Sequence, residues 1–374
     1  MYLTPSKKIA RSLDKHLCGP IYYFPSSGLK ALLLRYIFKF IGLLAIKKIT
    51  ELFINYGLVN ISLINNLHKI SRNFHKLQDA IFIGFGRHAS GEKAVKEAER
   101  YNAKWLLLED GFIRSVGLGS DGEITSSLVV DDVGIYYDSR SPSKIENLLN
   151  YDENLNGVDD INLAQEAIDL IKNNNITKYN HAEDIPPDYF PRNNRRRVLV
   201  VDQTKNDLSI IYGNPNSYTF NDILESVIQE NTGDDIYVKL HPESISGYKG
   251  ANFSIESLKK HNIHPITEQY NIISILKEMD SVYVMSSQVG LEALILDKHV
   301  VCFGTPFYAG WGLTDDRSEI KRRYRKRILI ELFIATYIKY TVFINTETGE
   351  RCDVTDAIRQ IIKKKPSYGQ VINH

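Results

Sequence analysis

The sequence predicts an α/β protein made of two domains that face a cleft, preceded by a helical extension. The chain has 374 residues, and a single domain usually takes ~150, so two domains are expected. It is 43% hydrophobic and 24% charged, which is ordinary globular composition. Short apolar runs alternate with helical patterns in two successive parts of the chain, and this alternation predicts parallel sheets.

Residues 1–78 form the predicted extension, because apolar residues recur there at helical spacing from Leu29 to Leu67. Nine basic residues against one acid give residues 1–50 a charge of +8, although the whole chain carries only +1. Arg35 and Lys39 interrupt the most apolar stretch, which excludes a membrane span and favours a peripheral helix. Such a helix either contacts the inner-membrane surface or packs on the body of the protein.

The location expected from the sequence is the cytoplasm. The first 20 residues lack the basic region and adjoining apolar run of a secretory signal. Three scattered cysteines fit a reducing compartment, and no spacing typical of metal ligands is visible. The near-neutral net charge argues against nucleic acid as a partner.

The first domain is expected over residues 79–194. Strands are predicted at 80–84, 104–108, 127–130 and 134–137, with helices at 93–101 and 161–173. Pro186, Pro187 and Pro191 then mark a hinge, which places the boundary near residue 195.

The second domain is expected over residues 195–320, followed by C-terminal helices that pack back on the body over 321–374. Two such α/β domains are the architecture of many sugar-nucleotide transferases, although a fold alone does not assign a function. The predicted strands lie at 197–202, 235–240, 281–285 and 299–303, and the helices at 219–231, 271–279 and 290–297.

Four groups of polar residues directly follow predicted strands, where ligands of parallel sheets bind. The acids and the serines also have a structural explanation, because they could simply cap turns and helices. Asp202 could be a nucleophile or a cap, and a phosphate would suit the histidine and lysine. The groups are Glu109 and Asp110 with Arg114, Asp202 with Gln203, His241 and Pro242 with Lys239, and Ser286 with Ser287.

Other conspicuous residues are expected to be structural. The second His-Pro pair, His264-Pro265, is expected in a loop, and the basic runs Arg195–Arg197 and Lys321–Arg327 are expected to be solvated faces. Trp311, between Gly310 and Gly312, either shapes a loop near the cleft or fills a packing site.

Five strings of residues, taken in order, resemble the capsule polysaccharide biosynthesis family of bacterial retaining β-Kdo glycosyltransferases. The resemblance runs from about residue 79 to about 365 and implies a GT-B-like pair of Rossmann-like domains. It also implies transfer of Kdo from CMP-Kdo to a glycan or glycolipid acceptor, with no metal or other cofactor. The strings occupy residues 109–119, 127–149, 238–244, 286–294 and 303–317.

The resemblance also implies roles for individual residues. Retention of configuration suggests double displacement with Asp202 as nucleophile, and Glu109 as acid/base with Asp110 as the alternative. His241 would help to neutralise the departing phosphate. The donor-binding residues implied are Arg114, Gln203, Lys239, Pro242, Ser286, Ser287 and Glu292.

Two other functions stay open at this point. One keeps the fold and the CMP but transfers a sialic or other nonulosonic acid. The other is a non-catalytic capsule assembly or export protein, which would have no need of acids and His-Pro at strand ends. Release of CMP from different donors would separate the three.

Overall fold

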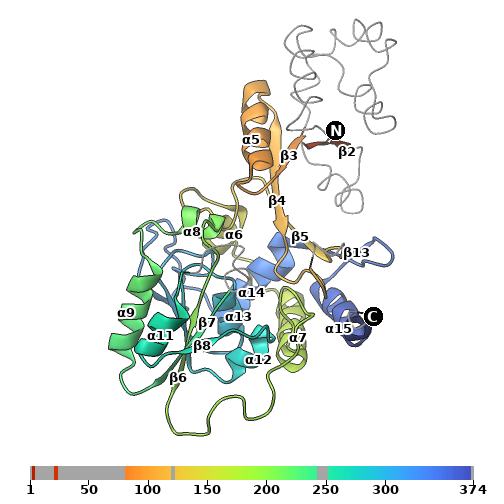
Figure 1. Cartoon of the computed structure of the whole chain (residues 1–374). Coiled ribbons are helices and arrows are strands. Elements are labelled where there is room, and N and C mark those ends of the chain that lie inside the picture. The colour runs from red at the N-terminus through yellow and green to blue at the C-terminus, as the bar shows by residue number, and fades with distance from the viewer. Residues whose placement is uncertain (1, 5–20, 24–80, 119–122, 242–251, 372–374) are drawn as a thin grey trace, which may run out of the picture. The chain divides into compact units, whose positions relative to one another are not determined.

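The computed structural model describes residues 2–4, 21–23, 81–118, 123–241 and 252–371 (Figure 1). The chain divides into two compact units. The first comprises residues 1–109, 129–135 and 347–351, and the second comprises 110–128, 136–346 and 352–374. The domain boundaries expected from the sequence, near 78, 194 and 320, stay predictions.

The first unit is built on parallel strands. β3 (Ile81–Phe85) pairs with β4 (Lys104–Asp110) on one side and with β1 (Tyr2–Thr4) on the other, and β1 pairs with β2 (Ile21–Tyr23). Helix α5 (Ala89–Tyr101) connects β3 to β4. A Cβ atom on Gly84 would lie 2.3 Å from the carbonyl oxygen of Ser90, so glycine is needed where the strand meets the helix.

Two sequence predictions are wrong in or beside this unit. The expected helical extension is a strand at both of its described segments, β1 and β2, whose aromatic and β-branched residues suit a sheet. The remainder of the extension lies outside the described residues. The expected strand at 134–137 is instead a turn, because the Asp131 carboxylate after β5 (Ser127–Asp131) accepts hydrogen bonds from Val133 N and Gly134 N at 2.9 and 2.8 Å.

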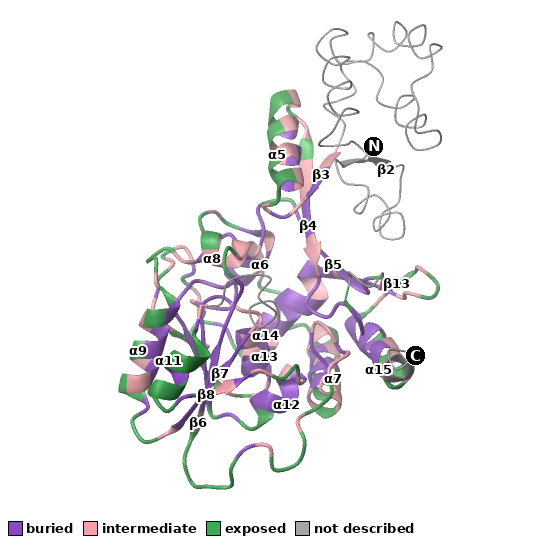
Figure 2. Ribbon diagram, viewed as in Figure 1, coloured by how far each residue is buried: buried purple, intermediate pink, exposed green. Residues whose placement is uncertain are grey.

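The second unit contains a six-stranded sheet in the order β11-β10-β9-β6-β7-β8, and its paired strands are parallel. Figure 2 shows the central strands buried and the outer faces of α9 and α11 exposed. The strands are β6 (Arg197–Val201), β7 (Asp235–Lys239), β8 (His264–Ile266), β9 (Ser281–Val284), β10 (His299–Cys302) and β11 (Asp315–Asp316). The helices between them are α8 (Leu208–Gly213), α9 (Phe220–Glu230), α11 (Ile255–Lys260), α12 (Ile272–Lys277) and α13 (Val289–Ile295).

The continuous apolar runs of β6, β7 and β9 explain this core. Val198 and Val200 of β6 are fully buried and pack with Ile223 and Val227 of α9, as expected for strands covered on both faces. The expectation of a loop at His264-Pro265 is wrong, because these residues form β8 and Pro265 pairs with Val238 of β7. A proline is tolerated there because β8 is an edge strand.

The rest of the second unit is mostly helical. Its C-terminal part also includes strand β12, in which Ile344 N donates a hydrogen bond to Ser126 O at 2.9 Å. The C-terminal helix α15 contacts α7 through an ion pair between Arg359 and Glu166. The elements are α6 (Lys144–Tyr151), α7 (Val158–Asn174), α14 (Leu329–Phe333), the π-helix η3 (Ile334–Tyr340), β12 (Thr341–Ile344) and α15 (Val354–Val371). Strand β13 (Arg351–Cys352) has its first residue in the first unit and its second in the second unit.

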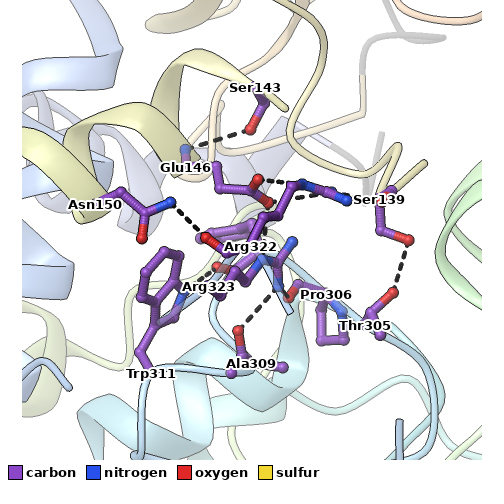
Figure 3. Close-up of polar contacts among 12 residues, drawn as sticks. Ser139, Ser143, Glu146, Asn150, Thr305, Pro306, Ala309, Trp311, Arg322 and Arg323 are labelled. Carbon is purple, nitrogen blue, oxygen red and sulfur yellow. Dashed lines mark hydrogen bonds and ion pairs between the residues drawn. The ribbon is translucent and has the colours of Figure 1, made fainter. Parts of the chain in front are cut away.

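The basic run Lys321–Arg327 is partly interior, so the expectation of a solvated face is wrong for two of its arginines. Arg323 and Arg327 are 7% and 9% exposed. Arg323 Nε lies 2.9 Å from the buried carboxylate of Glu146, and its Nη1 donates to the carbonyl oxygens of Pro306 and Ala309 (Figure 3). Arg322 also binds Glu146. The long-range ion pair therefore fastens this segment to α6.

The surroundings of Trp311 decide whether it shapes a loop near the cleft or fills a packing site. Its side chain is fully buried, and its indole N–H donates to Phe307 O at 2.8 Å. The Arg323 guanidinium lies 5.8 Å from the ring centroid. Trp311 therefore fills a packing site between the loop and the arginine (Figure 3).

Candidate functional site

The carboxyl ends of three neighbouring strands form the candidate site in the second unit. In the sheet, β6 lies between β7 and β9, so the residues after these strands reach the same edge. Asp202 follows β6, His241 follows β7, and Ser286 follows β9. Polar residues that are far apart in the sequence are therefore brought together by the strand order.

Asp202 is the most enclosed carboxylate of this edge, with 3% of its surface exposed. Its Oδ2 accepts a hydrogen bond from His241 N at 3.3 Å, and its Oδ1 accepts one from Asn252 Nδ2 at 2.9 Å. The cap of the next helix is Asp207, whose side chain accepts from Ser209 N. The alternative role of Asp202 as that helix cap is therefore wrong, and its carboxylate is held at the strand end.

Lys239, the last residue of β7, lies beside Asp202. The Asp202 N–H donates to Lys239 O at 3.0 Å, and Lys239 Nζ donates to Leu240 O at 3.2 Å. Burial lowers the pKa of Lys239 to about 8, an effect opposed by the charges of Glu268 and Asp202. His241 is half-buried. Pro242 lies outside the described residues.

Gln203 connects the end of β6 to the end of β9. Its Oε1 accepts from Ser286 N at 2.9 Å, and its Nε2 donates to Ser209 Oγ at 3.2 Å. Ser209 Oγ and Ser286 Oγ are 3.0 Å apart. Ser287 has a different role, because its Oγ accepts from Val289 N at 3.3 Å at the start of α13. Ser286 thus belongs to a polar cluster, whereas Ser287 makes the local turn contact typical of a cap.

The acidic end of β4 is held by an ion pair. Arg114 is 4% exposed, and its Nε lies 2.9 Å from Asp110 Oδ2. A Cβ atom on Gly111 would lie 2.0 Å from Ser127 Oγ, which explains the glycine of Glu-Asp-Gly. Glu109 is half-buried near the end of β4 and belongs to the first unit, whereas Asp110 begins the second.

Glu292, expected to bind the donor, points into the protein. Its carboxyl group is 4% exposed and accepts a hydrogen bond from Thr177 Oγ1 at 2.5 Å. Burial raises the pKa of Glu292 to about 7, although hydrogen bonds from Thr177, Lys178 and Gln288 oppose this effect.

Three partners in the site escaped the sequence analysis: Asn252, Thr177 and Ser209. Asn252 and Thr177 have no local pattern that distinguishes them from surface residues, because their partners lie 50 and 115 positions away. Ser209 could have been found, since an Asp two residues before a Ser is a recognisable helix start.

Two kinds of feature are absent from the described parts of the chain. No cluster of three or more His, Cys, Asp or Glu side chains is arranged to hold a metal ion there. Within the same residues, no helix has both the length and the apolar character to span a membrane.

The fold is that of an α/β protein with two sheets, as the sequence predicted, and polar residues gather at the carboxyl ends of the parallel strands of the second unit. The chain belongs to the capsule polysaccharide biosynthesis protein family, whose model matches residues 79–190 and 182–343. This confirms the resemblance found in the sequence.

Similar proteins carry capsule and lipopolysaccharide names. Capsule polysaccharide modification protein LipA of Neisseria meningitidis serogroup B is 36% identical over 316 residues, which cover 81% of this chain and 45% of LipA. Lipopolysaccharide-processing protein LpsZ of Rhizobium meliloti is 35% identical over 301 residues, which cover 79% of this chain and 67% of LpsZ. The chain thus spans about half the length of LipA.

Two solved structures from Thermosulfurimonas dismutans are similar to the chain. The KpsC β-Kdo 2,4 transferase superimposes with a TM-score of 0.70 and 36% identity, covering 82% of this chain and 97% of that one. The KpsC β-Kdo 2,7 transferase gives a TM-score of 0.64 and 26% identity, covering 97% and 98%.

Proposed function

We propose that the chain is a retaining β-Kdo glycosyltransferase that moves Kdo from CMP-Kdo to a glycan or glycolipid acceptor in bacterial surface polysaccharide synthesis. The observation that carries the proposal is the similarity to the KpsC β-Kdo 2,4 transferase, which extends over 97% of that chain. The enclosed Asp202 at the strand-end edge supports it, because retention by double displacement needs a positioned carboxylate.

In the first step, a carboxylate oxygen of Asp202 attacks the anomeric carbon of Kdo. The bond from that carbon to the phosphate oxygen breaks, and CMP leaves with the electron pair. Hydrogen bonds from His241 N and Asn252 Nδ2 fix the carboxylate without blocking every lone pair, because a carboxylate has about four acceptor sites.

The departing phosphate needs positive charge and hydrogen-bond donors. Lys239 and His241 lie beside Asp202, and Ser286 and Gln203 supply further polar groups at the neighbouring strand end. Such preorganised groups stabilise charge that develops in a transition state. The mechanism proposed here therefore requires no metal or other cofactor.

In the second step, the acceptor hydroxyl attacks the anomeric carbon, the bond to Asp202 breaks, and the hydroxyl proton passes to a carboxylate. Asp110 or Glu109 takes this proton in our proposal. Arg114 is paired with Asp110 and keeps its carboxylate oriented. The donor carboxylate is the other group that Arg114 could bind.

The acceptor side of the reaction includes a membrane surface in this proposal. A lipid-linked acceptor would be presented at the inner face of the inner membrane, which suits a peripheral cytoplasmic enzyme. The basic side chains expected to contact that surface belong to residues 1–78, most of which lie outside the described residues. The contact is tested by measuring whether the chain binds liposomes in a salt-sensitive way, and whether this binding is lost when residues 1–78 are deleted.

The proposal is tested by covalent trapping. In a Glu109→Gln, Asp110→Asn variant the second step is slow, so incubation with CMP-Kdo is expected to release CMP and leave one Kdo on the protein, detected by intact mass. Adding Asp202→Ala should abolish the adduct, whereas adding Asp159→Ala, at an exposed aspartate of α7, should not. CMP release from CMP-sialic acid instead of CMP-Kdo would contradict the assignment of CMP-Kdo as the donor. An adduct that survives Asp202→Ala would contradict the assignment of Asp202 as the nucleophile.

A further inference from the structure

Gln288 precedes α13 as its N-cap residue, and Glu292 lies four residues further on, at a spacing where helical side chains are neighbours. Gln288 Nε2 donates to Phe112 O at 2.9 Å, so this side chain reaches the segment that follows Asp110 directly. Glu292 reaches the same segment through residues 177–180. These two side chains therefore act on the segment from Asp110 to Val116.

The indirect connection runs through continuous hydrogen bonds. Thr177 Oγ1 donates to Glu292 Oε1, and Thr177 N donates to Asn180 Oδ1 at 2.9 Å. Asn180 Nδ2 then donates to Ser115 O at 3.0 Å, and Asn180 N donates to Val116 O at 2.8 Å. Thr177 and Asn180 are 8% and 0% exposed, so water does not compete for these contacts.

A second connection joins the same two segments. Arg114 N donates to Lys178 O at 3.0 Å, and Ser115 forms a bridge with Tyr179. Because Arg114 Nε contacts Asp110 Oδ2, a shift of residues 177–180 would move the Asp110 carboxylate as well.

We propose that Glu292 is a positioning residue that holds the Asp110–Val116 segment in register with Ser286, rather than a ligand of the donor. This inference rests on the proposed function, since it assigns Asp110 a part in the reaction. It reassigns Glu292 because a buried carboxyl occupied by Thr177 does not face a substrate.

The surroundings of Glu292 make this connection sensitive to pH. Lys178 faces it from the 177–180 segment, Gln288 from the N-cap of its own helix, Tyr308 from the loop after β10, and Tyr337 from η3. Burial raises the pKa of both tyrosines well above the ordinary value, so they stay neutral. The groups that contact Glu292 are donors, but burial penalises its ionised form more than these donors stabilise it, so the pKa is raised. The connection therefore weakens as pH rises through about 7, because opening it lets Glu292 ionise in water.

The test compares two buried threonines that have different partners. Thr177→Val removes the hydroxyl that binds Glu292, whereas Thr336→Val removes a hydroxyl that donates to Leu332 O within the helical segment, at 2.7 Å. Amide exchange of Arg114 and Asn180 is expected to be about fivefold faster in Thr177→Val than in Thr336→Val, because one hydrogen bond is worth roughly 1 kcal/mol. Thr177→Ser, which keeps the hydroxyl, should restore wild-type exchange.

Activity and pH supply the second readout. Transfer from CMP-Kdo should lose about tenfold in kcat in Thr177→Val, with little change in the donor KM, because misplacement affects the reacting geometry rather than binding. In the wild type, amide protection of Arg114 and Asn180 should decrease between about pH 6 and pH 8, and Glu292→Gln should remove this pH dependence.

Equal exchange in the two threonine variants, or an unchanged pH response in Glu292→Gln, would overturn the inference. If the wild-type chain transfers nothing from CMP-Kdo, the proposed function fails, and the exchange measurements still decide whether Glu292 positions the segment.

Discussion

Two buried glutamates of the second unit show two ways of placing a carboxyl group in a protein interior. Glu146 is 3% exposed and is held by two arginines, Arg322 and Arg323. Glu292 is 4% exposed, and the partner seen at its Oε1 is the neutral hydroxyl of Thr177. The first arrangement surrounds the carboxyl group with positive charge, whereas burial raises the pKa of the second to about 7, so it can change its protonation near neutral pH.

The largest effect is expected at the charged cluster. Glu146→Gln leaves the buried guanidinium of Arg323 without its counter-ion, and removing one partner of a buried ion pair costs about 3–5 kcal/mol. The free energy of unfolding, measured by urea denaturation, should fall by this amount. Glu166→Gln is the matched control, because Glu166 forms a half-exposed pair with Arg359, and such pairs contribute about 1 kcal/mol or less. Equal losses in the two variants would contradict the comparison.

A smaller effect is expected at Glu292, and it depends on pH. Burial raises the pKa of this group from 4.5 to about 7. Between these values the folded chain keeps a proton that the unfolded chain has released, so the free energy of unfolding falls as pH rises through that window. At 1.36 kcal/mol per pKa unit, the loss is about 3 kcal/mol.

The variant Glu292→Gln should remove this contribution. Its stability is expected to fall less than that of the wild type as pH rises from about 4.5 to 7, measured by urea denaturation at several pH values. Glu225→Gln, at an exposed position of α9, should follow the wild-type curve. A Glu292→Gln curve parallel to that of the wild type would show that Glu292 is ionised throughout the window.

The smallest effect concerns a neutral contact that supports the charged cluster. Asn150 Nδ2 donates to Arg322 O at 2.8 Å and is buried (Figure 3). Asn150→Ala leaves that carbonyl without this donor, which costs about 1–2 kcal/mol. Gln165→Ala removes an exposed amide that donates to Asp169 and should change the stability little. A loss at Asn150 as large as at Glu146 would mean that the ion pair itself contributes little.

The sequence analysis predicted the central sheet well and the basic run poorly, and the reason is the range of the interactions. The strands β6, β7, β9 and β10 are mostly apolar runs, so the local pattern is sufficient to identify them, whereas the three-residue strand β8 was missed. Arg323 is buried because of Glu146, which is 177 positions away in the sequence. A local pattern contains no information about such a partner, and a basic run by itself indicates solvent.

The same distinction applies to the candidate site. Asp202, Gln203 and Ser286 could be predicted because they directly follow strands, and parallel strands end at one edge. The orientation of Glu292 could not be predicted. The family resemblance implied that it binds the donor, yet the contact that turns it inward comes from Thr177, 115 positions earlier.

Strand β8 has a consequence for association between molecules. It lies at the edge of the six-stranded sheet, and its Pro265 has no N–H group to offer to another chain. Open sheet edges invite pairing with a second copy, and a proline in a short edge strand discourages this. The three residues of β8 therefore protect the sheet that positions the candidate site from intermolecular aggregation.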